Sequence, residues 1–500
     1  MAWARRWELW LAALIACGWR LALYLHYRPI GLGSDDLGLT ILFWHADALR
    51  AQLPDWWARM SLVTAGNWPP TFAWLAGLVA RLTSDPFAAG PIISAAASGA
   101  VVFVLARLTT RLTGDRWAGL AAGLFFAVAP LSVFWDAHVR AETLFVVFNF
   151  TAIYYLLAYV DGGRGRDLQW ATFWGAVSSC IKYDAIVLAV VLGWCWLRHL
   201  RRGGRRDLPL ALLGGLPWLV PVFWALSFGP ERFGNYDRLF NWITVAQFSA
   251  WFALTIATMP VVVTWPVFLL GALGVYALGR ERESRKALWV LAALMIIYLS
   301  IISVSNRWTA RYQLALLPYV AVLAAVGWAH LPPPRWLKPG LAALAVLTGL
   351  LISNQWVDAE QNRWKEIADA GQALARIAGP HDRVWSDDAY LLPYWAGRDV
   401  RPLRDFSDLR AGDVLAFTDF WGALQHKRTV ESSLSELGRR AHYQLRYKST
   451  RWFTPLAGEV LDPHVLAHKR ELRDLGPLAF WDRTLPVESS AVIVKVTSAP

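Results

Sequence analysis

The sequence predicts a polytopic α-helical membrane protein that ends in a small α/β domain. Of its 500 residues, 56% are hydrophobic and only 17% are charged, and the mean hydropathy is +0.34. Soluble domains carry about 25% charged residues, so these values exclude a chain of ordinary soluble domains. Apolar runs near the roughly 20-residue length of a membrane span recur up to about residue 356, after which charge returns. We expect a membrane domain over 1–356 and a soluble domain over 357–500.

About eleven membrane spans are expected. The first follows Arg5 and Arg6 and resembles a signal peptide, but no small-residue cleavage pattern ends it, so we expect it to be retained. Between the first two spans, "LGLTILFWHADALRAQL" has apolar residues at helical spacing, which is typical of a helix lying in the membrane interface. A second short helix is expected after "NWPP". The predicted spans are 7–25, 86–106, 117–134, 143–160, 170–181, 185–198, 208–228, 258–278, 287–303, 311–329 and 339–356.

The basic residues predict the orientation. The net charge is +12, but Lys and Arg cluster in short loops between apolar runs, so we read a topology signal and expect no nucleic-acid partner. One set of alternate loops holds 18 Lys and Arg, and the other, longer set holds 9. The N-terminus is therefore expected to be cytoplasmic. We expect the protein to lie in the plasma (inner) membrane. An odd number of spans places the tail outside.

The tail alternates helix-like and strand-like segments. "NRWKEIADAGQALARIAG" has helical periodicity, whereas "DRVWSDD", "GDVLAFTDF", "YQLRYKSTRWF" and "AVIVKV" read as strands bounded by turn residues. We therefore expect an extracytoplasmic α/β domain.

Most ionisable residues that are not cytoplasmic loop cations fall on the predicted outer side. We expect them to converge in one outward-facing cavity. They are Asp35, Asp36, Asp136, His138, Arg140, Glu142, Lys182, Tyr183, Asp184, Glu231, Arg232, Asp237, Arg238, Arg307 and Arg311.

Lys182 is the most informative of these cations. It lies at a tight break between two apolar runs, where a charge near hydrocarbon costs about 3 kcal/mol unless it is paired or reaches the interface. It is either a snorkelling loop lysine or a phosphate ligand, since lysine is a common point-charge partner of phosphate. Arg307 and Arg311, four residues apart where a late span opens, are either interface anchors or a second anion-binding element.

The acidic candidates also have two interpretations. Glu142, two residues after Arg140, is either an ordinary charge at a helix start or a site residue, and the spacing gives the two different partners. His138 alone is weak evidence for a metal. Asp35 and Asp36 are either a solvated loop pair or a site in which one carboxylate acts as base while the other positions it or binds a cation.

Together these elements resemble the GT-C superfamily of glycosyltransferases, in its protein O-mannosyltransferase-like and aminoarabinose-transferase-like branch. Trp68 departs from the family's usual His or Tyr, and Asp36 departs from the commoner Glu. The matching elements are Asp35-Asp36 in the first outer loop, Trp68-Pro69-Pro70, Arg140-Ala141-Glu142, Lys182-Tyr183, and "RYQLALLP" from Arg311 to Pro318.

The resemblance implies an enzyme that takes a sugar from a polyprenyl-phosphate donor and transfers it, with inversion, to an acceptor hydroxyl outside the membrane. Asp35 would act as general base, with Asp36 beside it, and either is the metal ligand if a divalent cation is used. Two groups of residues complete the implied site: Lys182, Arg311, Arg307 and Arg140 for the donor phosphate, and Glu142, Trp68, Tyr183 and His138 for positioning the acceptor. The acceptor is left open between lipid, polysaccharide and protein.

A secondary transporter is the alternative, because intramembrane charges also mark substrate pathways. It predicts paired internal repeats and charges near mid-membrane. No repeat is evident, and the charges lie at the outer ends of spans. A non-catalytic membrane scaffold would keep the topology and leave Asp35 dispensable.

Overall fold

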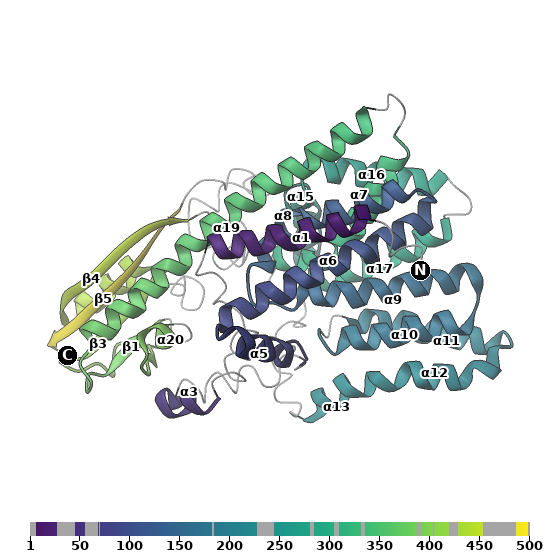
Figure 1. The fold of residues 1–500 in the computed structure, drawn as a ribbon. Helices are drawn as coiled ribbons and strands as arrows, with labels where there is room; N and C mark the ends of the chain where they lie inside the picture. The colour runs from purple at the N-terminus through teal and green to yellow at the C-terminus, as the bar shows by residue number, and fades with distance from the viewer. Residues whose placement is uncertain are drawn as a thin grey trace. The chain divides into compact units, whose positions relative to one another are not determined.

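A computed structural model describes residues 7–27, 46–55, 69, 71–182, 185–227, 245–280, 285–304, 310–331, 336–387, 392–403, 405–419, 429–453 and 487–498. The chain divides into two compact units (Figure 1). The first unit contains 1–26 and 65–355, and the second contains 27–64 and 356–500. The stretch 27–64, which we expected to belong to the membrane domain, therefore groups with the tail.

The first unit is helical. Local signals set the ends of several helices: the Asp85 side chain accepts the Phe87 N–H at the start of α6, and Gly114, with a φ of 70°, ends it. The helices are α1 (Trp7–His26), α5 (Thr71–Thr83), α6 (Pro86–Thr113), α7 (Arg116–Ala127), α8 (Pro130–Asp136), α9 (Glu142–Gly162), α10 (Gly165–Ser179), α11 (Ile186–Arg201), α12 (Leu208–Gly215), α13 (Leu219–Ser227), α15 (Val245–Val263), α16 (Trp265–Arg280), α17 (Arg285–Val304) and α18 (Leu317–Ala329), with 3₁₀ turns η3 (Gly204–Asp207), η4 (Leu216–Trp218) and η6 (Ala310–Ala315).

The helices pack in sequence order over much of this unit. Figure 1 shows α9, α10 and α11 side by side, and α10 packs against both neighbours and against α12. Helix α6 packs against α1, α7 and α9, so it lies among the helices of the N-terminal part of this unit. As expected, a helix, α5, follows "NWPP", and the short α3 (Ala46–Gln52) lies in the amphipathic stretch before it.

The expected number of eleven spans is not confirmed. Among the described residues, four helices are long and apolar enough to cross a membrane, or up to six if each of two bent pairs counts as one span. The bends explain part of the difference: α7 and α8 form one pair, bent by 55°, and α15 and α16 the other, bent by 117°. The prediction of one uninterrupted span over 258–278 is wrong, because the helix breaks at Thr264, whose φ is 77°. A β-branched residue in this conformation is a strained turn.

Helices α16 and α18 approach each other through glycines. A Cβ added at Gly274 would lie 1.8 Å from the carbonyl oxygen of Leu323, and one at Gly327 would lie 2.0 Å from the carbonyl oxygen of Leu270. Small residues let helix backbones approach this closely in membranes. The two glycines therefore set the distance between α16 and α18.

Gly274→Ala is expected to lower the stability of the protein by about 1–3 kcal/mol, because the two backbones must separate to admit the methyl group. Thermal unfolding of the full-length protein in detergent measures the effect. Gly279→Ala is the matched control on the same helix, where an added Cβ meets nothing within 4 Å. Equal melting temperatures for the two variants would contradict close packing at Gly274.

Helix α19 (Leu337–Ile377) is 41 residues long and contains the boundary between the units. The sequence predicted a span ending at 356 and a separate helix over 362–379. The structure joins them, since the described backbone stays helical between the two apolar and amphipathic patterns.

The second unit is built on a five-stranded sheet in the order β2-β1-β3-β5-β4. Strand β1 pairs in parallel with β2 and β3, whereas β5 pairs antiparallel with β3 and β4. The four strand-like segments of the tail all form strands. The elements are β1 (Val384–Ser386), α20 (Leu392–Ala396), β2 (Arg401–Pro402), β3 (Val414–Thr418), α22 (Val430–Arg440), β4 (His442–Phe453) and β5 (Val487–Ser498).

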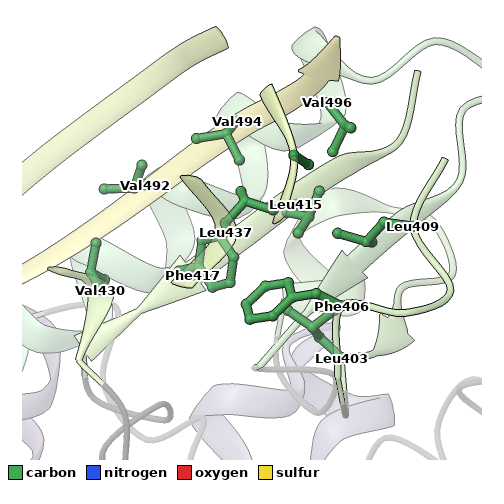
Figure 2. Close-up of a cluster of buried hydrophobic side chains, with 11 residues drawn as sticks. Leu403, Phe406, Leu409, Leu415, Phe417, Val430, Leu437, Val492, Val494 and Val496 are labelled. Atoms are coloured by element: carbon green, nitrogen blue, oxygen red, sulfur yellow. The ribbon is translucent and has the colours of Figure 1, made fainter. Parts of the chain in front are cut away.

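Apolar side chains from β3, β5 and α22 form the core of the second unit (Figure 2). Every residue of β3 is buried, which is typical of a central strand covered on both faces. Helix α22 begins with a capping box, in which Thr429 and Ser432 satisfy each other's backbone N–H groups. Phe406 and Phe417 fill the middle of the core, with ring centroids 6.4 Å apart.

An ion pair joins the end of this sheet to the turn before β1. The Asp382 carboxylate accepts hydrogen bonds from Lys495 Nζ and from the Gly379 N–H, both at 3.0 Å. The Lys495 hydrogen bond, with the Gly379 bond second, holds the pKa of Asp382 below its usual value. A carboxyl whose pKa is lower in the folded state stabilises the fold above its unfolded pKa and loses this effect as the pH falls through the folded pKa.

Asp382→Asn is therefore expected to lower stability at pH 7 by less than about 1 kcal/mol, since the pair is partly exposed. The difference between wild type and variant should shrink as the pH falls through the lowered folded pKa, because the wild-type carboxyl is then protonated too. Melting temperatures of the full-length protein between pH 7 and pH 3 measure it. Lys495→Met should show the same pH dependence, and a difference that persists at low pH would contradict the interpretation.

Candidate active site

The site is built where two helix connections of the first unit meet. Glu142 is the first residue of α9, and Lys182 lies just after α10, in the connection to α11. The Lys182 Nζ donates to Glu142 Oε1 at 3.3 Å, and the two side chains are only 9% and 7% exposed. Lys182 is therefore buried against a carboxylate and does not snorkel to the interface.

The backbone fixes Lys182 in this position. Its N–H donates to the Ser178 carbonyl at 2.9 Å, and its own carbonyl accepts the Ala185 N–H at 3.3 Å. The Ser178 hydroxyl in turn donates to the Phe145 carbonyl of α9 at 3.4 Å. The turn after α10 is thus tied to the first turns of α9, which brings Lys182 to Glu142 although 40 residues separate them.

The loop before α9 supplies two further predicted residues, both buried. The Arg140 guanidinium lies 5.1 Å from the centroid of the Trp135 ring, and His138 Nδ1 lies 2.9 Å from the Phe134 carbonyl oxygen. The contacts of Arg140 with Trp135 and of Glu142 with Lys182 come from the two ends of the Arg140-Ala141-Glu142 segment. Helix α6 approaches this loop closely, because a Cβ at Gly90 would lie 2.3 Å from the Cα of Val139.

A second buried ion pair lies beside the site. Arg20 of α1 donates from Nε to Asp136 Oδ2 at 2.6 Å, and neither side chain is more than 2% exposed. The hydroxyls of Ser132 and Thr143 also donate to Asp136. Arg20 further donates to the Ala127 carbonyl at 2.7 Å. Asp136 therefore connects α1, α8 and the start of α9, and Arg20 is a residue that the sequence reasoning missed. The available signal was a single arginine within the first apolar run, since buried intramembrane charges are usually paired.

Comparisons with known proteins bear on the family and the fold. Residues 67–227 match the sequence model of the dolichyl-phosphate-mannose-protein mannosyltransferase family. In structure, the chain is similar to ArnT from Cupriavidus metallidurans bound to undecaprenyl phosphate, with a TM-score of 0.57, 12% identity and coverage of 87% of this chain and 96% of that one. The resemblance to GT-C glycosyltransferases is therefore confirmed. The apo structure of the same ArnT gives a TM-score of 0.56, with 13% identity and coverage of 88% and 96%.

No curated protein sequence matches this chain. The matched segment contains six of the predicted site residues: Trp68, His138, Arg140, Glu142, Lys182 and Tyr183. Within that segment, a buried cation is held by a carboxylate where the start of α9 meets the end of α10.

Several predicted site residues lie outside what the structure describes. They are Asp35, Asp36, Trp68, Tyr183 and Arg307, and with them Asp184, Glu231, Arg232, Asp237 and Arg238. Arg311 is in η6, whose backbone is described and packs against α8 and α9. The turn that carries Arg311 thus adjoins the helices that carry Asp136 and Glu142. Within the described ranges, no group of three His, Cys, Asp or Glu is arranged to hold a metal ion.

Proposed function

We propose that this GT-C protein transfers a sugar from a polyprenyl-phosphate donor to an acceptor hydroxyl on the extracytoplasmic face of the plasma (inner) membrane, with inversion. The observation that carries the proposal is the buried Lys182–Glu142 pair inside the segment that matches the mannosyltransferase family. The ArnT to which the fold is similar is described as bound to undecaprenyl phosphate. The N-terminus is cytoplasmic, and the domain over 357–500 is extracytoplasmic.

Lys182 is the group proposed to bind the leaving phosphate. Glu142 keeps the lysine charged in a buried environment before the donor arrives. A lipid phosphate entering the site replaces the carboxylate as the partner of Nζ. The charge that grows on the phosphate in the transition state then meets a cation that is already in place, with little solvent to reorganise.

Arg311 is proposed to share this charge, with Arg307 and Arg140 further along the phosphate path. The position of η6 against α8 and α9 supports the placement of Arg311. The Arg140 guanidinium lies over the Trp135 ring in the loop before α9, which places its charge near Glu142 and Lys182. His138, Glu142, Trp68 and Tyr183 are the proposed acceptor-positioning residues.

Asp35 is the proposed general base, and Asp36 orients the acceptor or a divalent cation. In a single displacement, the acceptor oxygen forms a bond to the sugar C1 as the C1–O bond to phosphate breaks. Asp35 takes the hydroxyl proton, and polyprenyl phosphate leaves with the electron pair. Attack from the face opposite the phosphate inverts the configuration at C1.

Transfer by the purified full-length protein in lipid nanodiscs tests the proposal. A radiolabelled polyprenyl-phosphate sugar is the donor, with lipid, polysaccharide and peptide acceptors in parallel. Label is expected to move to one acceptor class, with release of polyprenyl phosphate, whereas a nucleotide sugar should give no product. Solute flux in proteoliposomes without any transfer would support a secondary transporter and contradict the proposal.

Lys182→Met is expected to lower kcat for this transfer by about 10²–10³-fold, because it removes a charge that stabilises the leaving phosphate. The single variant also leaves Glu142 buried without this cation, so its stability falls. Lys182→Met combined with Glu142→Gln removes both charges and separates the effects. Thermal unfolding should recover in the double variant, and transfer should not. Recovered transfer would contradict the phosphate-binding role.

A further inference from the structure

A pocket lies between α6 and α9 in the half of the two helices that is remote from the candidate active site. Its volume is about 150 Å³, and it is open to the surface. The two helices pack against each other along their length, so side chains of both line it. The lining residues are Phe103, Val104 and Arg107 of α6 with Thr151, Tyr154 and Tyr155 of α9.

Arg107 is the charged group of this pocket. Its guanidinium lies 4.9 Å from the centroid of the Tyr154 ring. In the part of the chain that the structure describes, it makes neither a hydrogen bond nor an ion pair. Arg111, one turn further along α6, also lies over Tyr154 but binds Asp161, with Nη2 and Oδ2 2.8 Å apart. The neighbouring cation is therefore neutralised, and Arg107 keeps its five N–H donors for a ligand.

The pocket is charged at the end nearer the C-terminus of α6, where Arg107 lies, and apolar one helical turn away, where Phe103 and Val104 lie. Tyr154 comes 12 residues after Glu142, which is about 18 Å along the axis, and Arg107 lies about 9 Å before the end of α6. Phe103 and Val104 are about one turn closer to the middle of the membrane than Arg107. The ring of Phe103 packs against Trp10 of α1, an exposed tryptophan near the start of that helix, with centroids 4.8 Å apart. Exposed tryptophans near helix ends are typical of the membrane interface.

We infer that this pocket binds the phosphate of an anionic phospholipid in the leaflet opposite the candidate active site. The Arg107 guanidinium donates to the phosphate oxygens as a planar fork, supported from below by the Tyr154 ring. An acyl chain of the same lipid lies against Phe103 and Val104. A lipid suits the pocket better than a soluble anion, because the apolar floor faces the hydrocarbon side and the cation lies at headgroup level. The site is separate from the proposed donor site.

Native mass spectrometry of the full-length protein, with phosphatidylglycerol and phosphatidylcholine of identical chains, tests the inference. Wild type is expected to bind phosphatidylglycerol more tightly than phosphatidylcholine. Arg107→Gln should weaken phosphatidylglycerol binding by about five- to tenfold and leave phosphatidylcholine unchanged. Arg166→Gln is the matched control: Arg166 is also exposed, lies four residues after the end of α9, and does not line the pocket.

Tyr154→Leu is a second variant that keeps the charge and removes the ring beneath it, and it should weaken phosphatidylglycerol binding by a smaller factor. Equal losses in Arg107→Gln and Arg166→Gln would overturn the site. Equal binding of the two lipids by wild type would overturn phosphate recognition. Competition by inorganic phosphate at the same concentration as the lipid would show a soluble-anion site, and so would overturn the choice of a lipid.

Discussion

Asp35→Asn is expected to lower the rate of sugar transfer by about 10²–10⁴-fold, the contribution typical of a positioned general base. The amide keeps the size and much of the hydrogen bonding of the carboxylate but cannot take the proton of the acceptor hydroxyl. Binding of the polyprenyl-phosphate donor should stay nearly unchanged, because the proposed phosphate ligands are Lys182 and Arg311. Single-turnover transfer and donor titration, measured on the same preparation, separate the two quantities.

Asp36→Asn is the matched comparison, since the two carboxylates are adjacent in "GSDDLGL". Adjacent side chains on an extended or turn backbone point in different directions, so only one is expected to reach the acceptor. Asp36→Asn should raise the acceptor KM or alter the dependence on a divalent cation, with a smaller effect on kcat. If Asp36→Asn abolishes transfer while Asp35→Asn does not, the assigned roles must be exchanged.

Asp136→Ala is expected to destabilise the protein by about 3–5 kcal/mol, because it leaves the buried guanidinium of Arg20 without its carboxylate. The hydroxyls of Ser132 and Thr143 lose their acceptor as well. Thermal or denaturant unfolding of the full-length protein measures the change. Its size should make the variant difficult to purify at the wild-type yield.

Two variants make this prediction specific. Asp167→Ala removes a carboxylate whose partner, Arg164, is 73% exposed, so its effect should be below about 1 kcal/mol. Arg20→Met combined with Asp136→Leu replaces both buried charges by apolar groups and should regain much of the stability lost by Asp136→Ala. If Asp136→Ala costs no more than Asp167→Ala, Arg20 and Asp136 do not form a structurally important pair.

The sequence identified single charged residues of the candidate site, but not which of them form ion pairs with one another. Lys182 stood out from the sequence as a charge at a tight break between apolar runs, and Glu142 as a charge at a helix start. Their contact depends on how α10 packs on α9, which no local pattern encodes. The same limit applies to Arg20 and Asp136, which are 116 residues apart. A hydropathy pattern shows that a charged residue lies within an apolar run. Its ion-pair partner depends on how the helices pack.

Some elements of the fold were also predictable from local sequence, and others were not. The strands β3 and β5 were predicted because their apolar composition is local, and α5 because Pro and a polar turn precede it. The break at Thr264 was not predicted, since an apolar run with no charge looks like one span whether or not its backbone turns. The continuity of α19 was also missed, because its pattern changes from apolar to amphipathic near residue 356 while the backbone remains helical.

The pairing of Arg20 with Asp136 also constrains how the protein is made. Helix α1 leaves the ribosome before α8, carrying an arginine whose insertion within a helix costs about 2.5–3.5 kcal/mol. Its carboxylate partner is encoded 116 residues later, which corresponds to roughly 6–23 s of synthesis at 5–20 residues per second. During that interval the nascent first helix depends on water, headgroups or the insertion machinery to solvate Arg20. The arrival of α8 then fixes α1 in place, so biogenesis of the first unit has a defined order.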